Sequence, residues 1–283
     1  MATVRVNGVN LYYGDSGSGE PVLMILGASS QVADVPYLVE SYSRNLRFIA
    51  YDRRGCGRSD DTDSAYGIAD LADEAAGLLD KLRLKSAVVY GISLGGMLAQ
   101  ELALRHPAKV RALILGCTTA GIVRGVRPSA ETLAAMTRNR SLSGDDAIEA
   151  GWPLGYSAAW IAANRESMLA RERATARLYP ISPASAMRQV IAATKHDTYD
   201  RLDQIACPVM LIHGAEDVSI PPGNSGMLAE LIPHAELHML DGLGHGYFLE
   251  GQAIADALIL DFVERVVAGE ATTKTEGAAH ATR

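Results

Sequence analysis

Short apolar runs separated by helical patterns recur along most of the chain. The first, Val22–Leu26, is continuously apolar and is followed by glycine, which is typical of a strand buried on both faces of a sheet. Similar runs follow, the last of them weaker, over 48–51, 87–90, 112–115, 209–212 and 237–240. Apolar residues at helical spacing predict helices between them, over 69–84, 94–104, 225–231 and 254–267. This alternation predicts an α/β fold with a mostly parallel central sheet flanked by helices.

Three parts of the chain depart from this alternation. Thr3 to Tyr13 alternates in polarity around Asn7-Gly8, which is a hairpin turn signal. The segment after about Thr119 has no clear strand run and is rich in Ala, Arg and Met, which predicts inserted helices. The end of the chain is small and polar. We expect an α/β core over 1–118 and 203–268, a helical cap over 119–202, and a disordered tail over 269–283.

Composition and charge narrow the class of protein. The chain has 283 residues, of which 48% are hydrophobic and 21% charged, so it can bury a large core and is not globally disordered. Its net charge of -7 disfavours a nucleic-acid partner, because nucleic-acid binders usually carry a basic excess. Cys56, Cys117 and Cys207 are odd in number and far apart, which predicts neither a disulfide framework nor a zinc cluster and fits a reducing compartment.

No targeting or membrane signal is visible in the sequence. Met1–Glu20 is polar and glycine-rich and has no apolar h-region, so we expect no signal peptide. The longest apolar runs span about eight residues, which is far short of a membrane helix. We therefore expect a cytoplasmic protein with no membrane partner.

One stretch carries a chemical motif. Gly91-Ile92-Ser93-Leu94-Gly95 reads Gly-x-Ser-x-Gly, directly after a buried strand run and directly before a predicted helix. That setting predicts a sharp, strained turn at the C-terminal edge of the sheet, where neighbouring side chains must be small. The helix N-terminus places N–H groups and a positive dipole end near developing negative charge. Glycine and serine are common, so this setting rather than the pattern alone makes Ser93 the candidate nucleophile.

The candidate general base is His245, since a serine hydroxyl is a weak nucleophile that needs a base. The chain contains seven histidines. His245 alone stands in a glycine-rich loop after the last strand run, Asp241–Phe248, and we expect the flanking glycines to let the ring reach a neighbouring loop. For His213 and His238, which belong to strand runs, we expect structural roles.

The candidate acid that orients the base is Asp217. It follows the strand run 209–212 and precedes His245 by 28 residues, which leaves room for one helix and one strand. Glu216 is its nearest competitor, and a turn or a helix cap is the structural alternative for Asp217. Some enzymes place this acid one strand earlier, but Leu115–Ala120 contains no carboxylate.

Together these residues resemble the α/β-hydrolase superfamily, over nearly the whole chain from Val4 to about Val267. The chain order of serine, acid and histidine is that of the family. Further stretches add to the resemblance: Tyr51–Ser59 looks like the Asp-x-Arg-Gly-x-Gly-x-Ser loop, Gly214 with Asp217 and Pro221 like the acid loop, and Gly244-His245 like the histidine loop. The set is much more specific for the fold than for a substrate.

One departure from the family concerns the loop after the first buried strand. Many relatives have His-Gly there, whereas here Leu26 stands in place of the histidine before Gly27. The resemblance still implies an oxyanion hole made by the backbone N–H groups of Ala28 and Leu94, because such a hole needs only backbone donors. Aclacinomycin methylesterase-like members also lack this histidine, and the sequence resembles them there.

The resemblance implies a serine hydrolase that cleaves a fairly apolar ester or lactone through an acyl-enzyme on Ser93. A C–C bond (β-diketone) hydrolase or a cofactor-free perhydrolase or haloperoxidase would use the same residues, and a slow ligand receptor of this fold is a remoter alternative. Trp152 and Trp160 are candidate substrate-binding residues of the cap. No cofactor is expected, because Gly17–Gly19 precedes a strand rather than a helix and no phosphate-loop pattern is present. No metal is expected, since His234 and His238 straddle a turn and a strand. The oligomeric state stays open, with a homodimer as one option.

Overall fold

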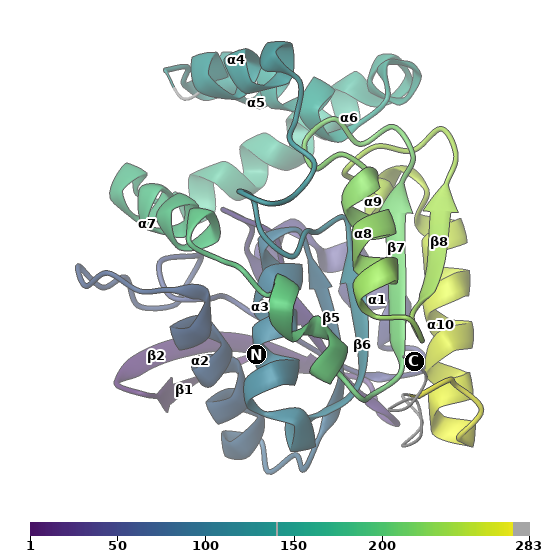
Figure 1. Cartoon of the computed structure of the whole chain (residues 1–283). Coiled ribbons are helices and arrows are strands. Elements are labelled where there is room, and N and C mark those ends of the chain that lie inside the picture. The colour runs from purple at the N-terminus through teal and green to yellow at the C-terminus, as the bar shows by residue number, and fades with distance from the viewer. Residues whose placement is uncertain (140, 274–283) are drawn as a thin grey trace.

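The computed structural model describes residues 1–139 and 141–273 and contains a central eight-stranded sheet (Figure 1). The strand order is β1-β2-β4-β3-β5-β6-β7-β8. The first two pairs are antiparallel and the other five are parallel, as expected for a mostly parallel sheet. The strands are β1 Ala2–Val6, β2 Val9–Ser16, β3 Pro21–Ile25, β4 Arg47–Tyr51, β5 Ala87–Ile92, β6 Val110–Gly116, β7 Val209–Gly214 and β8 Glu236–Leu240.

The predicted N-terminal hairpin is confirmed. Val6 of β1 pairs with Val9 of β2, and the two residues between them form the turn. Asn7 and Gly8 have φ of 48° and 88°, the left-handed conformation that two-residue hairpin turns of this kind need. The turn therefore fixes the register of the antiparallel edge of the sheet.

Helices cover both faces of the sheet, and each face has its own apolar core. Along β5, Val89 packs toward α2 and α3, whereas its neighbour Tyr90 packs toward α1 and α10, because alternate side chains of a strand point to opposite faces. The covering helices are α2 Ile68–Lys81, α3 Leu94–Arg105 and α8 Gly223–Leu231 on one face, and α1 Pro36–Tyr42 and α10 Gln252–Ala268 on the other. Short helices lie between these elements: η1 Val32–Asp34, η2 Pro107–Lys109, η3 Tyr199–Gln204 and α9 Tyr247–Glu250.

Four helices are inserted between β6 and β7, inside the range expected for the cap. They are α4 Ala130–Asn139, α5 Gly144–Gly155, α6 Ala158–Leu178 and α7 Pro183–Thr194. In Figure 1, α4, α5 and α6 lie beyond the C-terminal ends of the parallel strands. The chain leaves the sheet and returns to it at one place, where the Thr198 N–H donates to the Ala120 carbonyl at 2.8 Å. The insertion thus covers the sheet edge that carries the candidate chemistry.

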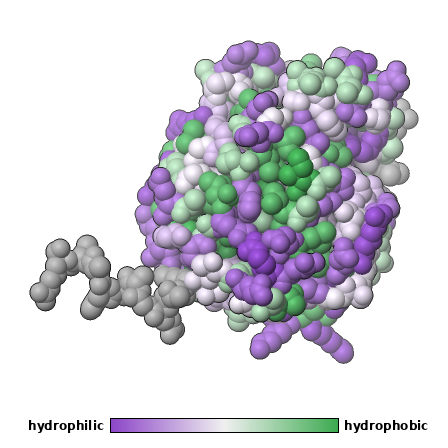
Figure 2. Space-filling view, turned by 90° about the vertical axis from the view of Figure 1, so that its right-hand side faces the viewer, coloured by the Kyte–Doolittle hydropathy of each residue, from purple (hydrophilic) through white to green (hydrophobic). Residues whose placement is uncertain are grey.

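The side of the molecule that carries β8 and α10 has an exposed apolar surface. Leu237 and Met239 of the edge strand β8, and Ile254 and Val267 of α10, all have exposed side chains. Figure 2 faces this side and shows apolar residues gathered at its centre. No helix within the described residues is long and apolar enough to cross a bilayer.

The helix α10 ends in a turn that opens the expected tail. Gly269 has a φ of 76°, and the Glu270 N–H donates to the Arg265 carbonyl at 2.8 Å, which caps the last helical turn. Of the segment 269–283 expected to be disordered, residues 274–283 lie outside the described part of the chain.

Candidate active site

Ser93 lies at the sharp turn between β5 and α3. Its φ of 57° and ψ of -121° are rarely adopted by a residue other than glycine, so the turn is strained as the motif predicts. A Cβ on Gly95 would overlap the Ile25 carbonyl of β3, and one on Gly91 would overlap the Gly95 carbonyl. Both glycines are therefore required by close packing of the turn, the start of α3 and the end of β3.

The turn that follows β6 connects Ser93 to His245. The Ser93 N–H donates to the Gly116 carbonyl at 2.9 Å, and the Thr118 hydroxyl donates to the Ser93 carbonyl at 2.7 Å. Cys117 lies between Gly116 and Thr118 in the chain. Its thiol donates to the His245 carbonyl at 3.4 Å, and its Sγ lies 3.9 Å from His245 Nε2. The segment Leu115–Ala120, which contains no carboxylate, thus holds the serine turn and the histidine loop together.

Asp217 and His245 are paired, as the sequence predicts. Asp217 Oδ2 lies 2.6 Å from His245 Nδ1, and Oδ1 accepts the backbone N–H groups of Ser219 and Ile220 at 2.8 and 2.9 Å. Burial alone would raise the pKa of Asp217, but the neighbouring histidines lower it to about 2. Glu216, the competing acid, is exposed. Asp217 is thus a buried carboxylate held in one orientation against the imidazole.

The pair fixes how His245 can act. Because the carboxylate accepts at Nδ1, that nitrogen carries the proton and Nε2 is the atom that can accept one. Burial lowers the pKa of His245, whereas the Asp217 carboxylate raises it, and the pKa lies above the ordinary value of 6.5. His245 lines the same cavity as Ser93. The arrangement can take a proton from a hydroxyl at the serine turn and return it to a leaving group.

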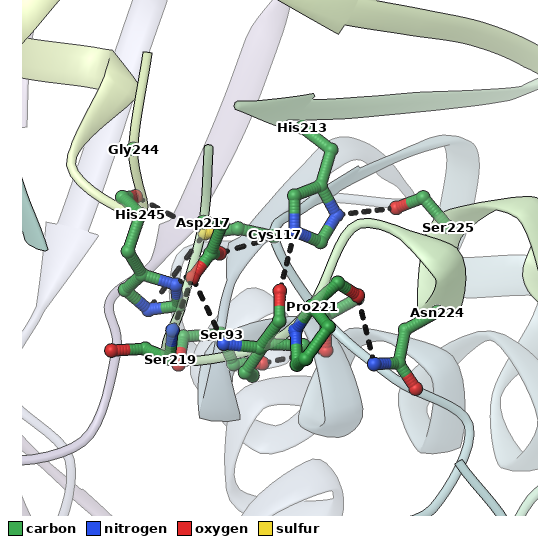
Figure 3. A network of polar contacts seen from close by, with 12 residues as sticks. Ser93, Cys117, His213, Asp217, Ser219, Pro221, Asn224, Ser225, Gly244 and His245 are labelled. Carbon is green, nitrogen blue, oxygen red and sulfur yellow. Dashed lines mark hydrogen bonds and ion pairs between the residues drawn. The ribbon is translucent and has the colours of Figure 1, made fainter. Parts of the chain in front are cut away.

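His213 belongs to the same network, which the sequence does not reveal. Its Nε2 lies 3.1 Å from Asp217 Oδ2 and 2.8 Å from the Ile220 carbonyl, while its Nδ1 lies 2.6 Å from Ser225 Oγ. A carbonyl only accepts, so Nε2 carries the hydrogen and shares it between the Ile220 carbonyl and the Asp217 carboxylate. Figure 3 shows His245, Asp217, His213 and Ser225 as one connected run of side chains.

The glycines beside His245 have a different role from the expected one. Neither Gly244 nor Gly246 has a positive φ, so neither is needed for backbone freedom. A Cβ on Gly244 would lie 2.7 Å from the Gly155 carbonyl, and one on Gly246 would overlap the ring of Tyr156. The Gly246 N–H also donates to the Gly155 carbonyl at 2.7 Å. The glycines therefore let the histidine loop pack against the end of α5 in the cap.

Arg53 holds the loop that follows β3. The Arg53 guanidinium is buried and donates to the Leu26 carbonyl at 2.9 Å and to the Gly27 carbonyl at 2.7 Å. From α7, Gln189 Oε1 accepts the Ser29 N–H at 2.9 Å. This loop lacks the histidine that many relatives have, and Arg53 together with Gln189 anchors it on both sides of Ala28.

The two residues expected to form an oxyanion hole belong to the loop after β3 and to the start of α3. Ala28 lines the cavity together with Ser93 and His245. Leu94 is the first residue of α3, and the N–H groups in the first turn of a helix have no acceptor within the helix. Both backbone groups are thus in segments that adjoin the serine.

A cavity of about 1000 Å³ lies between the cap and the C-terminal edge of the sheet. Ser93 and His245 lie on its wall from the core side. The cap contributes mainly apolar and aromatic side chains, namely Met136, Ile148, Leu154, Tyr156, Tyr179, Pro180 and Ile181. The size and this lining suit a small to medium organic molecule.

Trp152 and Trp160 are not among the residues that line this cavity. Trp152 is buried and its Nε1 donates to Glu172 Oε1 at 2.8 Å, while Trp160 stacks on Tyr156 at a centroid distance of 4.7 Å. Both indoles support residues that do line the cavity, Glu172 and Tyr156. Composition alone could not separate the lining residue from the one that packs behind it.

Three possible metal ligands also meet at this site. The donor atoms of Cys117, Asp217 and His245 lie within 4.8 Å of one another. Asp217 and His245 already bind each other, and burial raises the pKa of the Cys117 thiol, which disfavours the thiolate that binds metals. The geometry therefore suits proton transfer better than metal binding.

Comparison with known proteins agrees with this geometry. The family model described as alpha/beta hydrolase fold matches residues 20–252, which is most of the chain and includes all the loops described above. The chain belongs to the α/β-hydrolase family. The expected fold and family are thereby confirmed, while the family includes several kinds of hydrolase.

Three individual matches show the range of its relatives. The chain is 32% identical over 277 residues to the 2-hydroxymuconate semialdehyde hydrolase of Pseudomonas sp. (strain CF600), covering 90% of this chain and 91% of that one. It also resembles the structure of Est816, described as an N-acyl homoserine lactone degrading enzyme, at 28% identity. That match has a TM-score of 0.76 and covers 92% of this chain and 100% of the Est816 chain. An enol-lactonase from Burkholderia xenovorans LB400 shares the fold at 22% identity and a TM-score of 0.81, over 93% and 100% of the two chains.

Proposed function

We propose that this protein is a serine hydrolase that cleaves a carboxylic ester or a lactone through an acyl-enzyme on Ser93. The observation that carries the proposal is the pairing of His245 Nδ1 with the buried Asp217 at 2.6 Å, beside a cavity that both Ser93 and His245 line. The similarity to Est816, described as an N-acyl homoserine lactone degrading enzyme, supports a substrate of this chemical class.

In this mechanism, His245 Nε2 takes the proton of Ser93 as Oγ bonds to the substrate carbonyl carbon. The negative charge formed on the carbonyl oxygen is stabilised by the N–H groups of Ala28 and Leu94. Asp217 holds the imidazole and stabilises its charged form. The alcohol leaves with the proton from His245. A water molecule, deprotonated by His245, then attacks the acyl-enzyme. The bond from the acyl carbon to Ser93 Oγ breaks as His245 returns the proton to Oγ, and the acid is released.

The cavity supports a fairly apolar substrate. Its cap side is built mainly from apolar and aromatic side chains, whose burial against a ligand contributes about 25 cal/mol per Å² of apolar surface. Such walls bind acyl or alcohol chains without strong selection for one shape. Substrate preference within this class would therefore depend on chain length and on the polar groups at the cavity ends.

The test is the hydrolysis of acyl esters of graded length and of γ- and δ-lactones by the wild type, Ser93→Ala and Ser64→Ala. Ser64 is exposed and does not line the cavity, so its variant is the control. We expect turnover to fall by at least three orders of magnitude in Ser93→Ala only. A fluorophosphonate should add to the wild type and Ser64→Ala, with the mass shift absent from Ser93→Ala. Turnover or labelling that survives in Ser93→Ala would refute the proposal.

A second candidate is hydrolysis of a carbon–carbon bond next to a carbonyl group. The relative named 2-hydroxymuconate semialdehyde hydrolase favours it, because a semialdehyde of that kind has no ester bond for a hydrolase to break. Ser93-dependent cleavage of β-diketones or of dienoic keto acids, with no turnover of any ester or lactone, would select this candidate over the first.

A further inference from the structure

One part of the cavity wall is polar and charged, unlike most of its cap side. Asp34 of η1 and Arg171 and Glu172 of α6 all line it, beside the phenol rings of Tyr37 and Tyr156. The helix α6 packs against η1, so these side chains come from two facing elements, one from the core and one from the cap. A polar cluster of this kind costs free energy to bury and therefore calls for a ligand or a structural partner.

The charges of this cluster do not balance. Within the described residues, neither Asp34 nor Glu172 has a basic side-chain nitrogen within 4.0 Å of its carboxylate. Burial raises the pKa of both carboxyl groups, and Arg171 is the basic group that lowers both. With both acids ionised, two negative charges face one positive charge, and one more cation would make the cluster neutral.

Gln31 gives an independent sign that a ligand belongs here. Its side chain is 4% exposed and lines the cavity. The amide Nε2 donates to Asp34 Oδ1 at 3.4 Å, but the buried Oε1 has no hydrogen-bond partner within the described residues. A buried acceptor without a partner costs about 1 to 3 kcal/mol, so turning the amide until Oε1 meets a donor group of a ligand would be favourable.

We propose that this part of the cavity wall, formed by Gln31, Asp34 and Glu172, binds an ammonium group that the ester or lactone substrate carries away from its reacting carbonyl. The inference rests on the proposed function, since it places the substrate in the same cavity. An ammonium group supplies N–H donors for the Gln31 acceptor and the charge that the two carboxylates lack.

The surrounding rings and Arg171 shape this preference. Burial raises the pKa of Tyr37 and Tyr156, so both remain neutral phenols, and their π faces favour cations. Arg171 is of the same charge as the ligand and weakens its binding. A substrate with a carboxylate at this position would meet two like charges and is expected to bind worst.

The test compares the KM values of esters that share the same reacting end and differ in a remote group, which is ammonium, methyl, hydroxyl or carboxylate. The remote group is carried on chains of graded length, on the acyl side or on the alcohol side. At the best length, we expect the ammonium ester to have a KM about tenfold below that of the methyl ester, and the carboxylate ester to have the highest KM. Glu172→Gln should abolish this preference while keeping the acceptor for Trp152 Nε1. Arg171→Gln should strengthen the preference.

Glu166→Gln is the matched control, because Glu166 is on the same helix but is exposed. It should leave the preference unchanged. Equal KM values for the ammonium and methyl esters at every length, or the lowest KM for the hydroxyl or carboxylate ester, would overturn the proposed subsite while Ser93-dependent turnover continued.

Calorimetry on Ser93→Ala separates this inference from the proposed function. The probe is a simple alkylammonium ion, with the corresponding alkanol as its neutral counterpart. If no ester is a substrate, saturable binding of the ammonium that Glu172→Gln weakens about tenfold would still support the subsite. Absence of ammonium binding, or equal binding of the alkanol, would overturn it.

Discussion

His213 donates a hydrogen bond to the same Asp217 oxygen that His245 contacts. The His213 Nε2–Oδ2 distance is 3.1 Å and the His245 Nδ1–Oδ2 distance is 2.6 Å, so one carboxylate oxygen is shared by two imidazoles. Both His213 and Asp217 are fully buried, and the first of them is anchored by Ser225 from α8. His213 is therefore a positioning residue, which acts on the proposed base only through the acid.

Replacing His213 tests this role. We expect His213→Leu to lower kcat about 10- to 100-fold, the worth of a hydrogen bond to a charged group, and His213→Gln, which keeps an N–H donor, to recover part of the loss. Without the donor, Asp217 holds the His245 proton more strongly, so the acid limb of the pH–rate profile should move to higher pH. A lower melting temperature with an unchanged acid limb would instead indicate that His213 only supports the fold.

The pH dependence of hydrolysis follows from the pKa of His245. The proposed mechanism needs the unprotonated ring, and the pKa of His245 lies above 6.5, so kcat/KM should fall as pH is lowered through a midpoint above 6.5. Asp217→Asn removes the carboxylate that stabilises the protonated ring of His245. Its midpoint should therefore lie at lower pH, and its maximal rate should be lower by about three to four orders of magnitude. Initial rates across pH measure both effects, and a midpoint that stayed in place in Asp217→Asn would contradict the pairing.

Arg53 should affect the rate more than substrate binding. It fixes the carbonyls of Leu26 and Gly27, and through them the position of the Ala28 N–H in the proposed oxyanion hole. A single ammonium cannot reproduce the two guanidinium bonds, so Arg53→Lys should lower kcat about 10- to 1000-fold while KM changes little. Arg44→Gln, in an exposed pair with Glu40, is the control and should leave both constants unchanged. A change in KM alone would place Arg53 outside this role.

The sheet and the proposed triad were predictable because each depends on a local pattern. The parallel strands β3 to β7 each contain a short apolar run. Ser93 and Asp217 follow two of these runs and His245 follows the weaker run of the edge strand β8, so the topology places all three at one sheet edge. The contact of His213 with Asp217 cannot be predicted in the same way, because the histidine lies at the end of a strand run, where the sequence suggests only a structural role. Its partner, Ser225, is in a helix that the sequence predicts but does not orient.

The contacts between cap and core were not predictable, because they join segments far apart in the chain. Gln189 reaches the oxyanion loop at Ser29 across 160 residues, and no local pattern marks it. The same holds for Trp152 and Trp160. Their size suggested a pocket, but whether an aromatic ring lines a cavity or supports its wall depends on how α5 and α6 pack on each other.

Two glycines in helices near the site, Gly95 of α3 and Gly226 of α8, differ in the space that a side chain would have. A Cβ on Gly95 would overlap the Ile25 carbonyl and approach that of Leu26, so Gly95→Ala should push α3 away from β3 and the loop that follows it. We expect a loss of about 1 to 3 kcal/mol in the free energy of unfolding, together with a lower kcat. Gly226 of α8 has no atom within 4 Å of such a Cβ, so Gly226→Ala should stabilise the protein by about 0.5 to 1 kcal/mol with unchanged kcat. Urea unfolding and initial rates on both variants test this, and equal stability of the two would contradict the close packing of the serine turn on β3.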